Sequence, residues 1–131
     1  ATITHARGLV DSGKVGAVGY CLGGLLAYLT STRTDADASA GYYGVNIPAF
    51  LGEAANIKTP LALHIAGKDG FVNAEAQAQM KQGLAGNAMV TLYDYPERDH
   101  AFTREGGKNY DAGDAQIADS RTLAFFAQHL A

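Results

Sequence analysis

One cysteine of the chain lies where a nucleophile could be presented. Cys21 lies in the segment Gly19-Tyr20-Cys21-Leu22-Gly23-Gly24, between an apolar run typical of a buried strand and an apolar, helix-forming segment. A nucleophile on a sharp strand-to-helix turn needs small neighbours, and we expect side chains at Gly19 and Gly23 to collide with the backbone. The first N–H groups of the helix would favour the thiolate. A lone cysteine is more often a small core residue, but these glycines favour a nucleophile.

A thiol nucleophile needs a base, and the base needs an orienting group. His100 follows a predicted strand that Pro96 ends, and Asp69 follows the preceding strand in Gly67-Lys68-Asp69-Gly70. In a parallel sheet both residues would lie at the carboxyl edge, where Cys21 would also project. The chain order of nucleophile, aspartate and histidine is the order of hydrolases with this architecture. The sequence therefore predicts a Cys21, His100 and Asp69 triad.

Other polar residues have plainer interpretations. His64 lies inside a predicted strand, where a hydrogen-bonded structural role is expected, and His5 and His129 lie near the ends of the chain in solvated positions. Asp94 and Asp99 are alternative partners for the histidine base, but Asp94 lies within a strand and Asp99 is its sequence neighbour. No cluster of histidine, cysteine and acidic residues has the spacing of a zinc site, so no metal is predicted.

The elements that would position these residues alternate between strand and helix. We predict a loop through Gly44 and Pro48 into Ala49–Leu51, another loop over 97–113, and a helix N-cap at Asn73. Strands separated by helix-length segments imply crossover connections and a mostly parallel sheet of about four strands with flanking helices. The predicted strands are Val15–Tyr20, Ser39–Tyr43, Leu61–Ala66 and Met89–Tyr95, and the predicted helices are Leu22–Thr30, Ala74–Leu84 and Ala115–Leu130.

Composition restricts the class of protein. The chain has 131 residues, of which 47% are hydrophobic and 18% charged, which indicates a single folded domain over residues 1–131. Ten basic against thirteen acidic residues disfavour a nucleic-acid partner. No segment is long enough to span a membrane, and the glycine spacing fits neither a dinucleotide fingerprint nor a phosphate loop. A single cysteine and an N-terminus without the apolar core of a signal peptide suggest a cytoplasmic location.

Four segments together resemble the dienelactone hydrolase (carboxymethylenebutenolidase) family: 13–24, Gly41-Tyr-Tyr-Gly-Val45, 66–72 and Asp99-His-Ala-Phe-Thr-Arg104. The resemblance implies an α/β-hydrolase fold and the opening of unsaturated lactones without a cofactor. It implies that Cys21 is the nucleophile, His100 the base and Asp69 its orienting group. The implied substrate contacts are Arg104, which would hold a carboxylate, Tyr43 near the site, and the N–H of Leu22 as an oxyanion donor.

The resemblance covers the C-terminal half of the family enzyme, so we expect a truncated α/β-hydrolase-like domain. The other half would carry a second oxyanion donor, a second arginine and a glutamate that modulates the cysteine. Its absence would leave Val15–Tyr20 as an open apolar edge, and we expect a homodimer that covers this edge. Our leading hypothesis is a hydrolase that opens small lactones or related esters through an acyl-enzyme. The alternatives are a catalytically impaired oligomeric remnant and a thiol redox sensor that uses Cys21.

Overall fold

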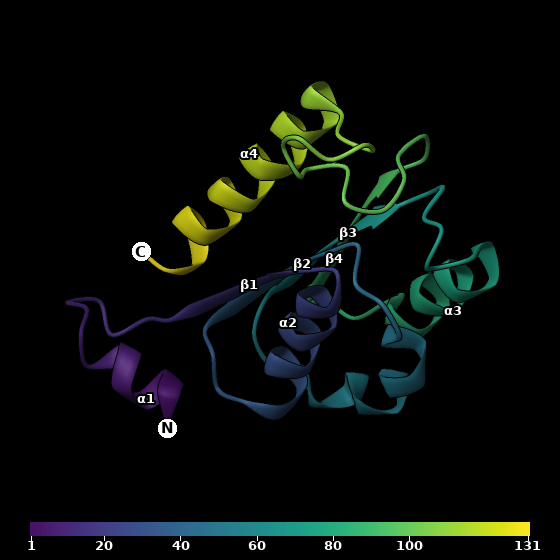
Figure 1. Ribbon diagram of the computed structural model, residues 1–131. Helices are drawn as coiled ribbons and strands as arrows, with labels where there is room; N and C mark the ends of the chain where they lie inside the picture. Colours follow the sequence, from purple (N-terminus) through teal and green to yellow (C-terminus); the bar gives the residue numbers. More distant parts are fainter.

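The computed structural model describes residues 1–131 and contains one sheet of four parallel strands (Figure 1). The strands are β1 (Gly16–Tyr20), β2 (Ala38–Tyr42), β3 (Leu61–Ala66) and β4 (Val90–Tyr95), and they pair in the order β1-β2-β3-β4. The helices are α1 (Thr2–Arg7), α2 (Leu22–Arg33), the 3₁₀ helix η1 (Ile47–Asn56), α3 (Ala74–Leu84) and α4 (Ala112–His129). The predicted parallel α/β architecture is confirmed.

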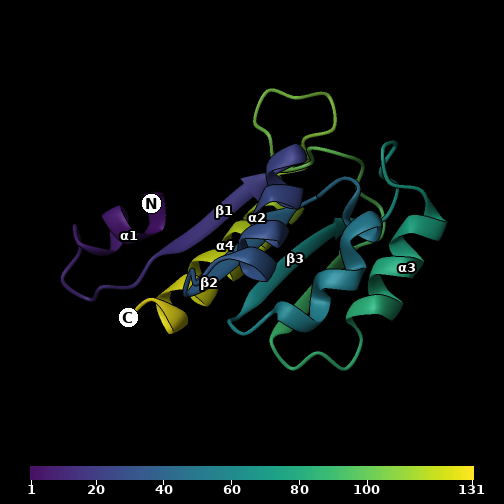
Figure 2. The same ribbon diagram turned by 90° about the horizontal axis from the view of Figure 1, so that it is seen from below.

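Helices cover both faces of this sheet. Figures 1 and 2 show α2, η1 and α3 on one face and α4 across the other, while α1 lies beside the β1 edge. The two central strands, β2 and β3, are buried along their whole length. The core under α2 and η1 is built from aliphatic and aromatic side chains, including Leu25, Tyr28, Ile47, Leu61 and Leu63. Burial on both faces explains why the β3 sequence reads as a continuous apolar run.

On the α4 face, one row of rings crosses all four strands. Tyr20, Tyr42, His64 and Tyr93 are register partners in β1 to β4, and neighbouring ring centroids lie 4.7, 4.3 and 5.3 Å apart. His64 is 1% exposed, and its ring nitrogens form hydrogen bonds of 2.8 Å with the hydroxyls of Tyr95 and Thr122. The structural role predicted for His64 is therefore confirmed.

Helix caps fix several of the element boundaries. The side chain of Asn73 accepts a hydrogen bond from the N–H of Ala76 at 2.8 Å, which confirms the predicted cap. Asp111 accepts one from the N–H of Asp114 at 2.8 Å, so α4 begins at Ala112 rather than at Ala115. The predicted loop through Gly44 and Pro48 into Ala49–Leu51 is wrong from Ile47 onward, because η1 begins there with Pro48 in its first turn. The short helix α1 was not predicted either.

The first strand forms one edge of the sheet. Its side chains Val18 and Tyr20 are each 49% exposed, and Leu22 and Leu26 of the following helix are exposed by more than half. The predicted open apolar edge is thus present in these residues. Among the helices, none combines the length and apolar character that crossing a membrane would require.

Candidate active site

The turn between β1 and α2 consists of one residue, Cys21. Its backbone has φ 60° and ψ −118°, a conformation that non-glycine residues rarely adopt. A Cβ atom added at Gly19 would lie 1.9 Å from the carbonyl oxygen of Gly23, so only glycine fits at position 19. The exposed thiol therefore projects from a turn whose strain is held by close backbone packing.

The expectation for Gly23 was wrong. A Cβ atom at Gly23 would meet nothing within 4 Å outside its own helix, whereas one at Gly24 would lie 2.7 Å from the carbonyl oxygen of Tyr42 and from Cα of Gly44. The second steric requirement therefore comes from the close approach of α2 to the end of β2. Gly23 takes part in the turn through its carbonyl group, which lies against Gly19.

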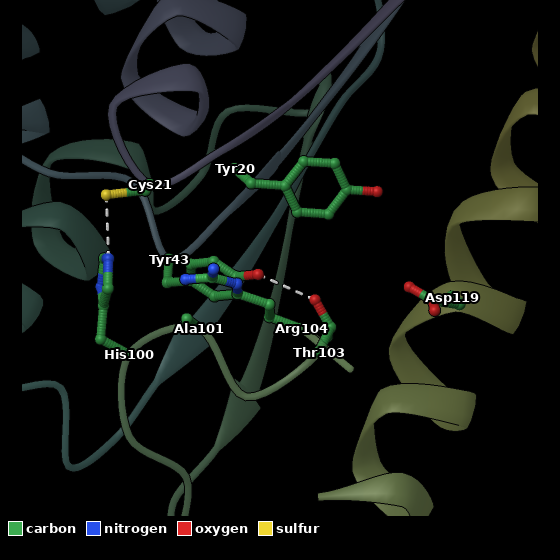
Figure 3. A pocket seen from close by; sticks show the side chains of 8 residues that line it. All are labelled: Tyr20, Cys21, Tyr43, His100, Ala101, Thr103, Arg104 and Asp119. Atoms are coloured by element: carbon green, nitrogen blue, oxygen red, sulfur yellow. Dashed lines mark hydrogen bonds between the residues drawn. The ribbon is translucent and has the colours of Figure 1, made fainter. Parts of the chain in front are cut away.

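The structure brings the three residues of the predicted triad together. His100 Nε2 lies 2.9 Å from Sγ of Cys21, and His100 Nδ1 lies 3.0 and 3.1 Å from the two carboxylate oxygens of Asp69. Figure 3 shows the Cys21 thiol directly opposite the His100 ring. His100 and Asp69 are both 7% exposed. The imidazole is therefore hydrogen-bonded on both ring nitrogens and shielded from most of the solvent.

The neighbouring carboxylate, Asp99, connects the two loops that carry the imidazole and its partner. Asp99 Oδ1 accepts hydrogen bonds from the backbone N–H groups of Gly70, at 2.9 Å, and His100, at 2.6 Å. The N–H of His100 and then that of Gly70 stabilise the charged form and lower the pKa of Asp99 below its usual range. Asp69 is held in turn by the N–H of Phe71, at 2.8 Å. Asp99 thus accepts hydrogen bonds from the backbone, whereas Asp69 is the carboxylate that contacts the His100 ring.

The other candidates lie away from the thiol. Asp94 forms an ion pair of 2.8 Å with Lys81. The ring of His129 packs against Phe125 at 4.9 Å, and His5 is exposed on α1. His129 is half-buried rather than fully solvated, and it lines a hollow together with Thr91 and Tyr93 of β4.

A cavity of about 460 Å³ opens beside the thiol (Figure 3). Arg104 and Tyr43, both expected near the site, line this cavity. The Tyr43 hydroxyl shares a hydrogen bond of 2.8 Å with Thr103, and burial raises its pKa. Its ring packs edge-on against His100 at 5.1 Å. The full lining is Tyr20, Cys21, Tyr43, His100, Ala101, Thr103, Arg104 and Asp119.

Backbone strain gathers around this cavity. Four non-glycine residues in the chain have positive φ, and three of them line the cavity: Cys21 (60°), Tyr43 (38°) and Ala101 (63°). Cys21 and Tyr43 directly follow β1 and β2, and Ala101 lies in the loop after β4. Strained residues of this kind cluster at functional sites, where the surrounding packing holds them.

Four lining residues were not predicted from the sequence: Tyr20, Ala101, Thr103 and Asp119. Tyr20 alternates along β1 with residues of the opposite face, and this alternation could have placed it on the face of Tyr42. Asp119 lies on α4 between the buried positions Ala118 and Thr122. No local motif marks it, because only the docking of α4 against β2 brings it to the cavity.

The N–H of Leu22 is the first of α2. The first N–H groups of a helix have no partner inside the helix and carry part of its positive dipole end. Since Leu22 directly follows Cys21, this group lies beside the position of the thiol. It is the backbone donor that an anion formed next to the sulfur could use.

Comparisons with known proteins identify relatives of this chain. The chain is 48% identical over 109 residues to a protein of Azospirillum brasilense named "Putative carboxymethylenebutenolidase". The aligned region covers 83% of this chain and 47% of that protein. It is 38% identical over 128 residues to the carboxymethylenebutenolidase of Pseudomonas putida, with 97% of this chain and 54% of that protein covered. The chain therefore spans about half the length of the curated relatives it matches.

A solved structure shares the fold. The crystal structure titled "Putative Dienelactone Hydrolase" from Klebsiella pneumoniae superposes with a TM-score of 0.83 and 25% identity, over 98% of this chain and 60% of that one. The model of the dienelactone hydrolase family matches residues 1–130. On these grounds the chain belongs to the dienelactone hydrolase family.

Proposed function

We propose that this chain carries the catalytic site of a hydrolase that opens small lactones or cleaves related esters. The observation that supports the proposal is the continuous hydrogen-bonded series from the exposed Cys21 thiol through the His100 imidazole to the Asp69 carboxylate. A base within hydrogen-bond reach of a nucleophile, and itself oriented by a third group, is the arrangement that covalent catalysis requires. The relatives named carboxymethylenebutenolidase point to the same chemistry.

In the first half of the reaction, His100 Nε2 takes the proton of Cys21, and the thiolate attacks the ester carbonyl. A C–S bond forms, the C–O bond of the ring breaks, and the leaving oxygen takes the proton from the imidazolium. In the second half, His100 removes a proton from water, and the resulting hydroxide attacks the thioester. The C–S bond breaks, the acid is released, and the proton returns to the thiolate.

Neighbouring groups would stabilise the charges that these steps create. Asp69 accepts from the Nδ1–H group and favours the imidazolium. The N–H of Leu22 would donate to the oxyanion, a contact that is typically worth about 10²–10³ in rate in related sites. Arg104, at the cavity wall, would hold a substrate carboxylate through its two-pronged donor geometry. Tyr43 would support the imidazole through its ring contact.

Turnover of an activated aryl ester and of a dienelactone tests the proposal, with the intact mass of the protein measured in parallel. We expect turnover that Cys21→Ala and His100→Ala both abolish, and an acyl adduct that accumulates in Asp69→Asn. Alkylation of Cys21 by iodoacetamide without ester turnover would favour a catalytically impaired remnant. Ready oxidation by peroxide, again without turnover, would favour a thiol sensor.

We also propose that a second copy of the chain covers the β1 edge. An edge strand leaves alternate N–H and C=O groups unpaired, and here Val18 adds half-exposed apolar surface. Analytical ultracentrifugation should give a dimer that Val18→Lys converts to a monomer, while Leu123→Lys on the outer side of α4 has no effect. A wild-type monomer at micromolar concentration would refute this.

The free thiol that the chemistry needs fits a reducing compartment such as the cytoplasm.

A further inference from the structure

The cavity beside Cys21 contains a carboxylate that the triad does not use. Figure 3 shows Asp119 on α4, across the cavity from the thiol and from Arg104. Arg104 forms no ion pair in this structure, and neither does Asp119. The same cavity therefore presents a cationic and an anionic group that do not neutralise each other, which leaves both available to a ligand.

Asp119 is held in position from below by the sheet. The hydroxyl of Tyr42 donates to Asp119 Oδ1 at 2.9 Å and lies 2.7 Å from Oγ1 of Thr122. Thr122 is also bonded to Nε2 of His64 at 2.8 Å. Tyr42 and His64 are each 1% exposed, so this anchor is a fixed part of the core. Because only one carboxylate oxygen is bonded to Tyr42, the other can accept from a ligand.

Aromatic surface lies between the thiol and this carboxylate. The rings of Tyr20 and Tyr43 both line the cavity, with centroids 6.3 Å apart, and the Tyr20 ring in Figure 3 extends from the Cys21 turn toward α4. An acyl chain could lie along these rings with its carbonyl at Cys21. A group at the far end of such a chain would then face Asp119.

We propose that Asp119 is a binding site for a hydrogen-bond donor, a hydroxyl or an ammonium group, at the end of the ligand remote from Cys21. Together with Arg104, it selects carboxylic acids that also carry a donor group, and it disfavours diacids by repulsion between like charges. Selection among substrates during turnover rests on the proposed function. Binding of a ligand to Arg104 and Asp119 does not require turnover and can be measured separately.

Binding to Cys21→Ala, in which no acyl transfer can occur, tests the site directly. The probes are 6-aminohexanoate, 6-hydroxyhexanoate, hexanoate and adipate, titrated by NMR at low ionic strength because salt screens an open site. We expect the amino and hydroxy acids to bind about threefold or more tightly than hexanoate, with adipate weaker than hexanoate, as exposed charge interactions allow. Adding Asp119→Asn should remove the preference for the amino acid and strengthen adipate. The amide oxygen still accepts from Tyr42, so the position of α4 is preserved.

Two controls separate this site from other effects. Glu75→Gln removes one negative charge from the exposed first turn of α3 and should leave all ratios unchanged. Arg104→Met should weaken every acid by a similar factor, since all share a carboxylate. Equal ratios with and without Asp119→Asn, or no binding of any probe at tens of millimolar, would overturn the inference. If the wild-type chain turns over esters but the binding ratios do not depend on Asp119, the Asp119 site is refuted and the proposed hydrolase stands. If the binding ratios are as expected but the wild-type chain shows no turnover, only the proposed hydrolase is refuted.

Discussion

The carboxylate of Asp99 accepts a hydrogen bond from the backbone N–H of Gly70, at 2.9 Å, and its same oxygen accepts from the N–H of His100, at 2.6 Å. This one atom therefore connects the loop after β3, which carries Asp69, to the loop after β4, which carries the imidazole. The position of the His100 ring relative to the Asp69 carboxylate therefore depends on a residue that touches neither the thiol nor the cavity.

Substitution at Asp99 should accordingly impair positioning rather than chemistry. In Asp99→Ala we expect kcat/KM for an aryl ester to fall by about tenfold, because the variant loses the two charge-assisted hydrogen bonds that join the loop of Asp69 to the loop of His100. Asp99→Asn keeps an acceptor oxygen and should retain most activity. Ester turnover and thermal unfolding of both variants measure this. Equal losses in the alanine and asparagine variants would show that charge, not the backbone contact, matters.

Asp69 should act through the orientation of the imidazole. Asp69→Asn keeps the size of the side chain but cannot stabilise the imidazolium, and such changes lower kcat by about 10³–10⁴ in comparable triads. The N–H of Phe71 can still bond to the amide oxygen, so stability should change little. The measurement is kcat against pH, together with far-UV circular dichroism as a check on folding. Near wild-type kcat in a folded variant would remove Asp69 from the triad.

The two glycines on either side of the Cys21 turn, Gly19 in β1 and Gly23 in α2, should respond differently to substitution by alanine. Gly19→Ala places a Cβ atom 1.9 Å from the carbonyl oxygen of Gly23, so it must displace the backbone, and we expect a loss of stability of about 3 kcal/mol or more. Gly23→Ala meets nothing within 4 Å outside its own helix and should be neutral or stabilising by up to about 1 kcal/mol through helix propensity. Urea denaturation of the two variants checks this, and equal destabilisation of both would contradict the packing described for the turn.

The strands were predicted well from the sequence because they depend on local signals. The run Leu61–Ala66 and the helix Ala74–Leu84 match β3 and α3 residue for residue, since a buried strand reads as a continuous apolar run and Asn73 provides a cap. The proximity of Cys21, His100 and Asp69 could be expected from topology, because parallel strands bring their carboxyl ends to one edge. These rules need only the neighbouring residues in the sequence or the order of the strands, and both can be read from a single sequence.

The features that were missed depend on contacts between distant segments. Asp119 reaches the cavity only because Tyr42, far away in the chain, binds α4 to β2. The role of Gly24 depends on the close approach of α2 to Gly44. The 3₁₀ helix η1 has a weak local signal, since Pro48 can begin a helix as readily as it marks a loop. No periodicity or spacing in the sequence indicates that α4 lies against β2 or that α2 lies against Gly44, because tertiary packing determines both contacts.

The buried His64 should make the fold sensitive to mild acid. Burial, and then the charge of Arg121, lowers its pKa from 6.5 to about 4. Between pH 4 and 6.5 the unfolded chain therefore binds more protons than the folded chain, so the stability of the fold falls as the pH is lowered through this range. The free energy of unfolding should decrease by about 2 kcal/mol between pH 7 and pH 5 on account of this residue. Urea denaturation at both pH values, compared with His64→Gln, isolates the effect, because glutamine can hydrogen-bond but does not titrate. The variant should be less stable at pH 7 yet lose less stability on acidification; an identical decrease in both proteins would assign the acid sensitivity to other groups.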